Sequence, residues 1–254
     1  EIMPSLVGSE MCIRDRPFSE STLRIRASYK DIFRVPTFTD LYYLRMGNTN
    51  LKPEETSQYN VGVTWSSSCG DWLRHFSISA DGYYNTVKDK IVALPTMYVW
   101  KMMNMGEVDI KGVDVNLSTQ FRLPLRMSLL LASTYSFQYA VDVTDPEAKN
   151  YKDQIPYTPR HSGTVSVTLE NPWVNVSYIL TAVGDRYALP QNIDRNRIDS
   201  YIEQSISINR DFRFRYFGLR LQGELLNLAN VNYDVIQYYP MPGRSWRLSI
   251  CLSY

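Results

Sequence analysis

The side chains that most often carry catalysis are scarce in this sequence, which holds only two histidines and three cysteines. His75 lies beside a predicted short turn, and His161 follows a predicted long loop. His161 with Asp145 or Asp153 is the one set that could activate water, because a histidine base needs a carboxylate partner to orient it. No second convergent acid accompanies this set. A hydrolytic enzyme is therefore kept only as an alternative.

The remaining reactive residues indicate no further site. Cys12, Cys69 and Cys251 have no paired spacing, so they predict neither a disulfide framework nor a zinc site. The sequence has no glycine-rich phosphate loop and no nucleophile elbow. We therefore expect no catalytic residues, no metal and no cofactor. Function must then reside in binding loops and in the elements that position them.

Charge and hydropathy narrow the class of protein. The chain has 27 basic and 26 acidic residues and a net charge of +1, which gives no electrostatic reason to bind nucleic acid. Mean hydropathy is −0.29, and no run of about 18 apolar residues predicts a transmembrane helix. A membrane β-barrel can have such an average because its strands alternate lipid-facing and lumen-facing residues. The 19 tyrosines fit the interfacial girdles of a barrel, or a carbohydrate-binding sandwich.

Residues 1–16, EIMPSLVGSEMCIRDR, are expected not to belong to the protein. One allowed coding of Met11–Arg16 matches the end of an adapter used in sequencing libraries, read in frame. An ordinary extracellular loop is the alternative. We assign residues 1–16 to an adapter-derived segment and residues 17–254 to one β domain.

From Ser21 onward, apolar and polar residues alternate with the period of two that predicts β-strands. The pattern indicates an all-β, antiparallel sheet of about ten strands, many near the length that a tilted strand needs to cross lipid. The phase of the alternation changes between Ile110 and Val113. We expect a β-bulge at Gly112 to reconcile the two halves, because glycine inside a strand often marks one.

The predicted connections alternate between short and long. The short ones lie near residues 67–73, 122–126, 171–173 and 213–216, and the long ones near 35–54, 92–104, 145–160, 190–199 and 234–245. Short turns at one end and long loops at the other are typical of an outer-membrane barrel. The fold of a soluble sandwich does not require its short and long connections to alternate in this way.

The polar row of the strands is rich in charge. We expect these residues to face a wet lumen and to be paired mostly by cross-strand salt bridges: Arg24, Arg26, Asp81, Glu203, Arg220, Glu224 and Arg247. The last predicted strand alternates up to an aromatic C-terminal residue. It resembles the signal that the barrel-assembly machinery recognises, carried by Trp246, Leu248, Ile250, Leu252 and Tyr254. An ordinary edge strand is the alternative.

Two blocks carry a family resemblance. Residues 33–65, FRVPTFTDLYYLRMGNTNLKPEETSQYNVGVTW, resemble a strand end followed by an Asn-x-x-Leu-Lys-Pro-Glu loop, and residues 223–254 resemble a family ending with Pro-x-Pro-Gly-Arg before the last strand. Residues 104–117 resemble a strand that follows an extracellular loop. Together they resemble the C-terminal barrel of a TonB-dependent outer-membrane receptor of the cobalamin and siderophore type.

The resemblance implies a transmembrane barrel of about 22 strands around an N-terminal plug, of which this chain supplies about the last ten. Such a receptor lies in the bacterial outer membrane, is inserted by the assembly machinery, and imports a corrinoid or an iron chelate with energy supplied by the TonB complex. Contact with TonB is expected of the plug, which this sequence lacks.

Ligand contacts are expected from the long loops at the rim. Flat aromatic side chains there could stack on a corrinoid or an aromatic chelate, or could serve as loop packing; they are Tyr42, Tyr43, Tyr98, Trp100, Tyr238 and Tyr239. Arg45 could attract an anionic ligand. Asn48, Asn50 and Pro53 are expected to fix loop shape.

Three other functions stay open at this point. A passive porin would share the barrel but lack a plug. A small outer-membrane protease of about ten strands would need His161 at its rim. A soluble sugar-binding sandwich would bury the apolar rows between two sheets.

Overall fold

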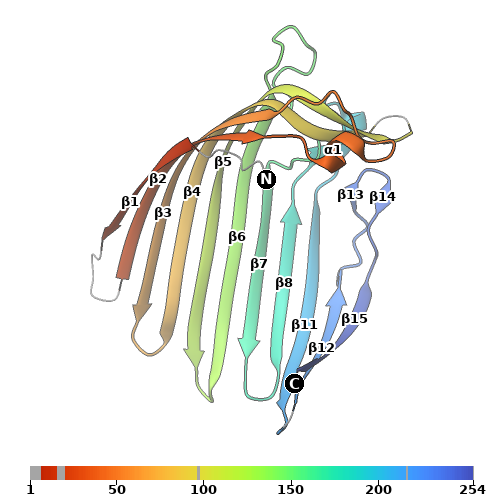
Figure 1. Cartoon of the computed structure of the whole chain (residues 1–254). Helices are drawn as coiled ribbons and strands as arrows, with labels where there is room; N and C mark the ends of the chain where they lie inside the picture. The colour runs from red at the N-terminus through yellow and green to blue at the C-terminus, as the bar shows by residue number, and fades with distance from the viewer. Residues whose placement is uncertain (1–6, 16–20, 96–97, 216, 254) are drawn as a thin grey trace.

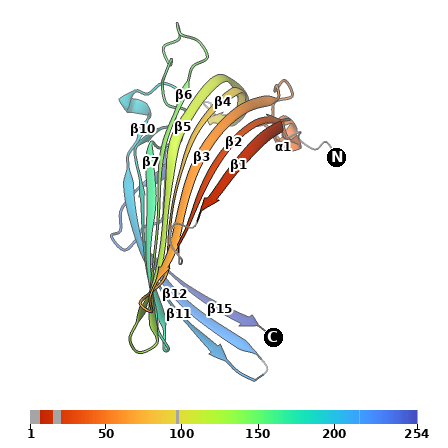
Figure 2. The ribbon, with the colours of Figure 1, turned by 90° about the vertical axis from the view of Figure 1, so that its left-hand side faces the viewer.

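The computed structural model describes residues 7–15, 21–95, 98–215 and 217–253. Its main element is one strongly curved antiparallel sheet (Figure 1 and Figure 2). The ten strands expected from the alternation are all present and pair in chain order: β2 (Ser21–Arg34), β3 (Glu54–Cys69), β4 (Leu73–Pro95), β5 (Trp100–Leu123), β6 (Met127–Asp142), β7 (His161–Glu170), β8 (Asn175–Val183), β11 (Tyr201–Arg213), β12 (Gly218–Leu226) and β15 (Ser245–Ser253). The all-β, antiparallel prediction is confirmed.

One further strand, β1 (Val7–Asp15), pairs with β2 and forms one edge of the sheet, while β15 forms the other. The described sheet is therefore open. The edge of a sheet offers free backbone groups to any extended segment. The assignment of residues 1–16 to an adapter-derived segment stays a prediction.

Short elements lie within the long loops. They are α1 (Phe38–Tyr42), β9 (Arg186–Tyr187), the 3-10 helix η1 (Asp194–Asn196), β10 (Arg197–Ile198), β13 (Asp234–Ile236) and β14 (Tyr239–Pro240). All of them gather at one end of the sheet, and the tight turns gather at the other (Figure 1). The expected asymmetry of the connections is confirmed. Among the described residues, no helix is long and apolar enough to span a membrane.

The predicted long loop at residues 92–104 is wrong. β4 and β5 continue to Pro95 and Trp100, with 23 and 24 residues respectively. These lengths exceed the roughly 9–11 residues that a strand needs to cross a membrane once. The upper part of the hairpin therefore extends beyond the other strands and forms a wall against which the loops pack.

The predicted bulge at Gly112 is also wrong. Tyr83, Gly112 and Gln138 are consecutive partners in an unbroken register across three strands. The change of phase has another cause, because the surroundings of one face change along β5. Near the tight turns this face carries polar residues such as Asp114, whereas towards the loops it carries Val108, which is fully buried. Each face of β5 therefore keeps its alternate residues along the whole strand, and only the surroundings of that face change.

A small hydrophobic core covers that upper face. Its buried members come from β4, β5, β6 and the β6–β7 loop: Val87, Met105, Val108, Ile110, Ala140 and Ile155. Full burial of one such aliphatic side chain stabilises a fold by about 1.5–3 kcal/mol. The core thus anchors the β6–β7 loop, through Ile155, to the long hairpin.

The residue registers place all seven charged residues expected in the lumen on one face of the sheet. One cross-strand row of this polar face runs through Arg24, Thr64, Ser79, Asn116, Thr134, Thr164, Thr181 and Glu203. Ion pairs link the strands here. Arg26 of β2 reaches across Gly62 of β3 to Asp81 of β4 at 2.8 Å, and Arg220–Asp211 at 2.6 Å and Arg247–Glu224 link neighbouring strands. The expected cross-strand pairing is confirmed, although each exposed pair contributes at most about 1 kcal/mol.

The opposite face is apolar and has an aromatic row at its upper boundary. Tyr29, Tyr59, Tyr84, Lys111 and Tyr139 are successive cross-strand partners. The lower boundary carries the ring pairs Trp65–Phe76 and Trp72–Phe121. Along β4, the step from Tyr84 down to Phe76 is about 27 Å, or about 20 Å in height for a tilted strand. This spacing is typical of the two aromatic girdles of a membrane barrel.

Candidate functional site

The residues predicted to contact a ligand all lie at the loop end of the sheet, but the structure does not gather them into one site. Tyr42 and Tyr43 follow one another at the end of α1 and are exposed. Tyr98 is 88% exposed and Tyr238 80% exposed, and neither forms part of a described hollow. Tyr239 in β14 is exposed as well, and Arg45 adopts a positive φ of 67° in the β2–β3 loop.

Trp100 is the exception among the predicted residues. It begins β5, is half-buried, and its ring centre lies 5.7 Å from that of Tyr157 in the β6–β7 loop. Both rings line a hollow of about 420 Å³, which also has walls from β4, β9 and β13. The β4–β5 hairpin and segments from three loops thus converge on this hollow. We take it, with the loops that frame it, as the candidate binding site.

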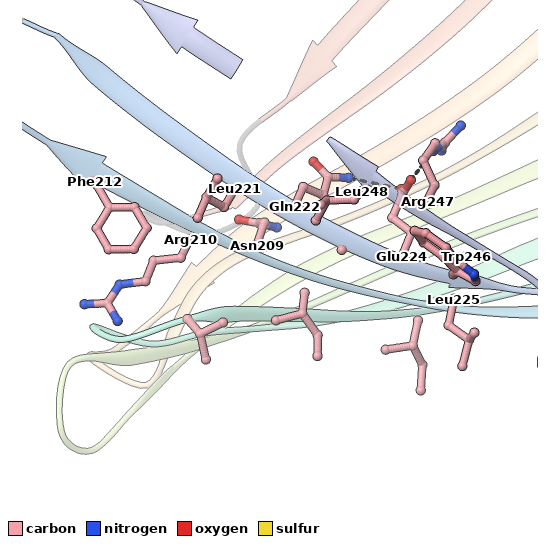
Figure 3. A pocket seen from close by; sticks show the side chains of 14 residues that line it. Asn209, Arg210, Phe212, Leu221, Gln222, Glu224, Leu225, Trp246, Arg247 and Leu248 are labelled. Atoms are coloured by element: carbon pink, nitrogen blue, oxygen red, sulfur yellow. Dashed lines mark hydrogen bonds and ion pairs between the residues drawn. The ribbon is translucent and has the colours of Figure 1, made fainter. Parts of the chain in front are cut away.

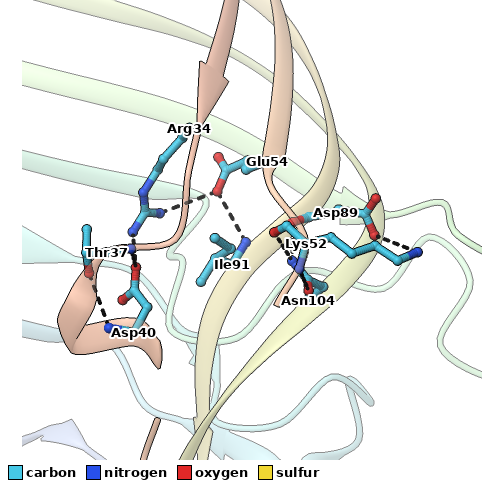
Figure 4. Close-up of polar contacts among 8 residues, drawn as sticks. All are labelled: Arg34, Thr37, Asp40, Lys52, Glu54, Asp89, Ile91 and Asn104. Atoms are coloured by element: carbon cyan, nitrogen blue, oxygen red, sulfur yellow. Dashed lines mark hydrogen bonds and ion pairs between the residues drawn. The ribbon is translucent and has the colours of Figure 1, made fainter. Parts of the chain in front are cut away.

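The β2–β3 loop carries α1 and is held by a polar cluster (Figure 4). The Thr37 hydroxyl accepts from the Asp40 backbone N–H at 3.2 Å, and Asp40 accepts from the Thr37 N–H at 2.9 Å, which forms a capping box. Arg34 from β2 donates to Asp40 at 3.1 Å. Burial by itself raises the pKa of Asp40, but Thr37 and Arg34 lower it by more, so the pKa lies below its ordinary value.

The Lys-Pro-Glu part of the same loop is fixed to the β4–β5 hairpin by two side chains (Figure 4). The Asn104 side chain accepts from the Lys52 N–H at 2.8 Å and donates to the Lys52 and Asp89 carbonyl oxygens at 3.1 and 2.7 Å. Glu54 accepts from the Ile91 N–H at 3.2 Å. The loop is therefore attached to the hairpin by directional bonds.

Asn48 adds a further attachment. Its side-chain amide donates to the Met102 carbonyl oxygen at 3.1 Å, and its carbonyl accepts from the Asn50 N–H at 3.0 Å. The Met102 N–H in turn donates to the Met46 carbonyl oxygen at 2.9 Å. The expectation that Asn48 fixes loop shape is confirmed.

The last long loop, between β12 and β15, is held by groups from three other segments. Arg186 in β9 donates to the carbonyl oxygens of Asp234 and Val235 at 2.5 and 3.1 Å. The Tyr233 hydroxyl donates to Glu203 at 2.8 Å, and burial together with this carboxylate raises the pKa of Tyr233. Burial also raises the pKa of Tyr157, which lies beside the backbone of Gln237 in this loop.

Three residues that shape the site were missed by the sequence reasoning. Asn104, Tyr157 and Arg186 lie in stretches that the alternation could mark only as strand ends or loops. Their roles depend on contacts with segments about 30 or more residues away in the chain, and a period-two pattern carries no information on such contacts. The resemblance did point to the Lys-Pro-Glu loop, which is the partner of Asn104.

The proposed hydrolytic set is not assembled. His161 Nδ1 lies 2.8 Å from the Tyr135 hydroxyl, and its ring packs against Phe137. Asp153 accepts from the Asn192 N–H, and Asp145 accepts from the N–H of a residue in its own loop. The imidazole and the two acids thus have different partners, and this arrangement gives no support to a rim protease.

A larger hollow, of about 640 Å³, lies near the C-terminal edge of the sheet (Figure 3). Its apolar lining, from β11, β12 and β15, belongs to the face that carries the aromatic row. Trp246, Leu248, Ile250 and Leu252 all alternate onto this face and are exposed, while Tyr254 lies outside the described residues. Their role as an assembly signal stays a prediction.

The sequence matches the family described as "TonB dependent receptor-like, beta-barrel" over residues 17–228. With the curved antiparallel sheet, its polar and apolar faces and its loops at one end, this match defines the class of protein. The chain belongs to the TonB-dependent receptor β-barrel family. It supplies a C-terminal portion of such a barrel.

Curated relatives include two proteins named "Vitamin B12 transporter BtuB". The one from Photobacterium profundum is 27% identical over 236 residues, which cover 89% of this chain and 34% of the relative. The one from Vibrio vulnificus is 24% identical over 221 residues, which cover 84% of this chain and 32% of the relative. The chain spans about a third of the length of these relatives.

Solved structures share the fold at low identity. The copper transporter OprC superposes with a TM-score of 0.70 at 16% identity, covering 98% of this chain and 38% of that one. The unliganded ferric citrate transporter FecA gives 0.69 at 11% identity, covering 96% and 38%. The proteins named in these comparisons are transporters or receptors rather than enzymes.

Proposed function

We propose that this chain is part of an outer-membrane receptor that captures a scarce nutrient at its extracellular loops and imports it with energy from the TonB complex. The observation that carries the proposal is the family match over residues 17–228 on a sheet whose long loops all lie at one end. In this role the apolar face meets outer-membrane lipid and the polar face lines the lumen. The assembly machinery inserts the barrel, and a plug domain outside this sequence contacts TonB.

The geometry supports separate roles for the loops and for the polar face of the sheet. Capture requires loops with a defined shape, and side chains such as Asn104 and Arg186 hold these loops on a stiff hairpin and on each other. Passage requires a wet wall, which the polar rows supply. Ion pairs across this wall, such as Arg26–Asp81, neutralise its charge, so a ligand of either sign can pass.

Cobalamin is the first nutrient to test, and ferric chelates are the second. Two curated relatives are named for vitamin B12 transport, whereas the structures of copper and iron transporters share only the fold with this chain. Exposed aromatic side chains at the rim, among them Tyr42, Tyr98 and Tyr238, offer flat surfaces to a corrin ring or an aromatic chelate.

The test is uptake by the complete receptor in a Gram-negative host that lacks its own cobalamin and ferric chelate receptors. We expect labelled cyanocobalamin or a ferric chelate to accumulate in cells that express the receptor. An uncoupler that collapses the proton gradient should abolish this accumulation. Cells with an empty vector serve as the control.

Two outcomes would contradict the proposal. Accumulation of small solutes that an uncoupler leaves unchanged would indicate a passive porin. Failure to take up any corrinoid or ferric chelate, with the receptor shown to be in the outer membrane, would exclude import of these nutrients.

A further inference from the structure

The hollow beside Trp100 contains a charged group that the fold does not fully satisfy. Arg186 lines this hollow and is only 3% exposed. One terminal nitrogen, Nη2, donates to the Asp234 and Val235 carbonyl oxygens, and the guanidinium lies 5.6 Å from the ring centre of Tyr201. The other terminal nitrogen, Nη1, is buried and has no acceptor within the described ranges.

The charge of Arg186 is not neutralised either. No carboxylate of the residues that the structure describes forms an ion pair with it. A buried cation that lacks an anionic partner carries a desolvation cost of several kcal/mol or more. Carbonyl dipoles and an aromatic face compensate only part of this cost. The site therefore favours the entry of an anionic oxygen.

The rest of the lining is suited to an apolar group. It includes the rings of Trp100 and Tyr157 and the side chains of Leu94, Ile155 and Ile236. The two rings are tilted by 39° to one another and both line the hollow, so they offer aromatic surface to a planar ligand. A volume of about 420 Å³ lies within the range of small-molecule pockets.

We propose that this hollow binds an apolar or aromatic group that carries a carboxylate or another anionic oxygen, and that Arg186 holds this oxygen. The proposal rests on the proposed function and extends it by naming the chemical class of the part of the nutrient that binds here. Because Nη1 is covered, lining side chains of the loops must shift for the oxygen to reach it. The bound state then supplies the missing acceptor and the missing negative charge.

The experiment compares two ligands that differ only in charge, naphthalene-2-carboxylate and naphthalene-2-carboxamide. Their affinities for the complete receptor in detergent micelles are measured by calorimetry, with matched micelles on both sides. We expect the acid to bind at least about tenfold more tightly, as one charge-assisted hydrogen bond provides. In Arg186→Gln, which keeps an amide donor for the Asp234 and Val235 carbonyls, the preference should fall below about twofold.

A second variant keeps the proposal testable if Arg186→Gln fails to assemble. Val235→Trp retains the backbone carbonyl that Arg186 contacts and fills the hollow with a large side chain. It should abolish binding of both ligands, and unchanged binding would contradict the assigned location.

Equal affinity of the unmodified receptor for acid and amide would overturn the proposal. Arg186 would then only position the last loop, or would be paired with an acid from another part of the receptor. The nutrient uptake assay separates the two proposals. A preference for the acid in a receptor that imports nothing would leave this site in place and refute the proposed function.

Discussion

At the scale of single residues, the shape of the β2–β3 loop depends on a few directional bonds. Asn104→Ala removes two hydrogen bonds that attach Lys52 to the hairpin and a third, to Asp89, within the hairpin. We expect the loop to open locally, at a cost of about 1–3 kcal/mol, because backbone groups lose their partners. Limited proteolysis within residues 35–53 should become at least several times faster.

A matched control lies on the same strand. Among the described residues, the Asn116 side chain bonds Ser79 alone, at 3.4 Å, on the polar face far from this loop. Asn116→Ala should therefore leave the rate of loop cleavage unchanged. Equal cleavage in the Asn104 and Asn116 variants would show that the side chain of Asn104 does not hold the loop.

The lowered pKa of Asp40 predicts a dependence of loop order on pH. A carboxylate whose pKa is depressed in the folded state stabilises that state above its unfolded pKa of about 3.9, and this stabilisation is lost as the pH falls through the lower, folded value. A nitroxide attached to Tyr42→Cys should become more mobile in that acidic window. In Asp40→Asn the mobility of the label should no longer change in this pH range. If the change persists in this variant, a group other than Asp40 causes it.

At the scale of elements, the sequence predicted strands well and loop contacts poorly. Alternation locates ten strands because one face meets an apolar surrounding and the other a polar one, so a row such as Val61 and Val63 against Gly62 and Thr64 is visible in the sequence. The same rule failed at Gly112. There the strand leaves the zone in which its faces differ, and loop residues such as Ile155 cover the polar side.

The candidate site was predicted only in its general position. The aromatic residues assigned to long loops do lie at the rim, but only Trp100 lines the hollow, and it belongs to β5 rather than to a loop. Arg186 could not be found from the sequence, because its role depends on carbonyl groups of Asp234 and Val235 in another loop. Long-range contacts of this kind leave no periodic pattern in the chain.

Within β5, the close packing at Gly112 predicts an effect of substitution. A Cβ at this position would lie 2.6 Å from the Tyr83 ring and would also collide with the Phe137 carbonyl oxygen. Gly112→Ala should therefore destabilise the barrel by about 1–3 kcal/mol. Gly223 in β12 has open space around its Cβ position and is the control. Urea unfolding of the complete receptor in micelles measures both, and equal midpoints would argue against the described packing.

At the scale of the whole molecule, the open sheet predicts how the isolated chain behaves. In lipid every backbone group must be paired, so a sheet that ends in free edges at β1 and β15 is not stable there. We expect the chain alone to aggregate or to fail to insert into vesicles. Gel electrophoresis with and without heating measures this, and a folded band that shifts on heating would show that the chain can close or associate by itself.

The account as a whole depends on the two faces of the curved sheet meeting different surroundings. Nitroxide labels at successive positions from Val113 to Ser118, in the complete receptor reconstituted into lipid vesicles, measure this most directly by their accessibility to oxygen and to a water-soluble nickel chelate. We predict that labels at Val113, Val115 and Leu117 respond to oxygen and those at Asp114, Asn116 and Ser118 to the chelate. Equal accessibility at adjacent positions, or the opposite alternation, would contradict the account.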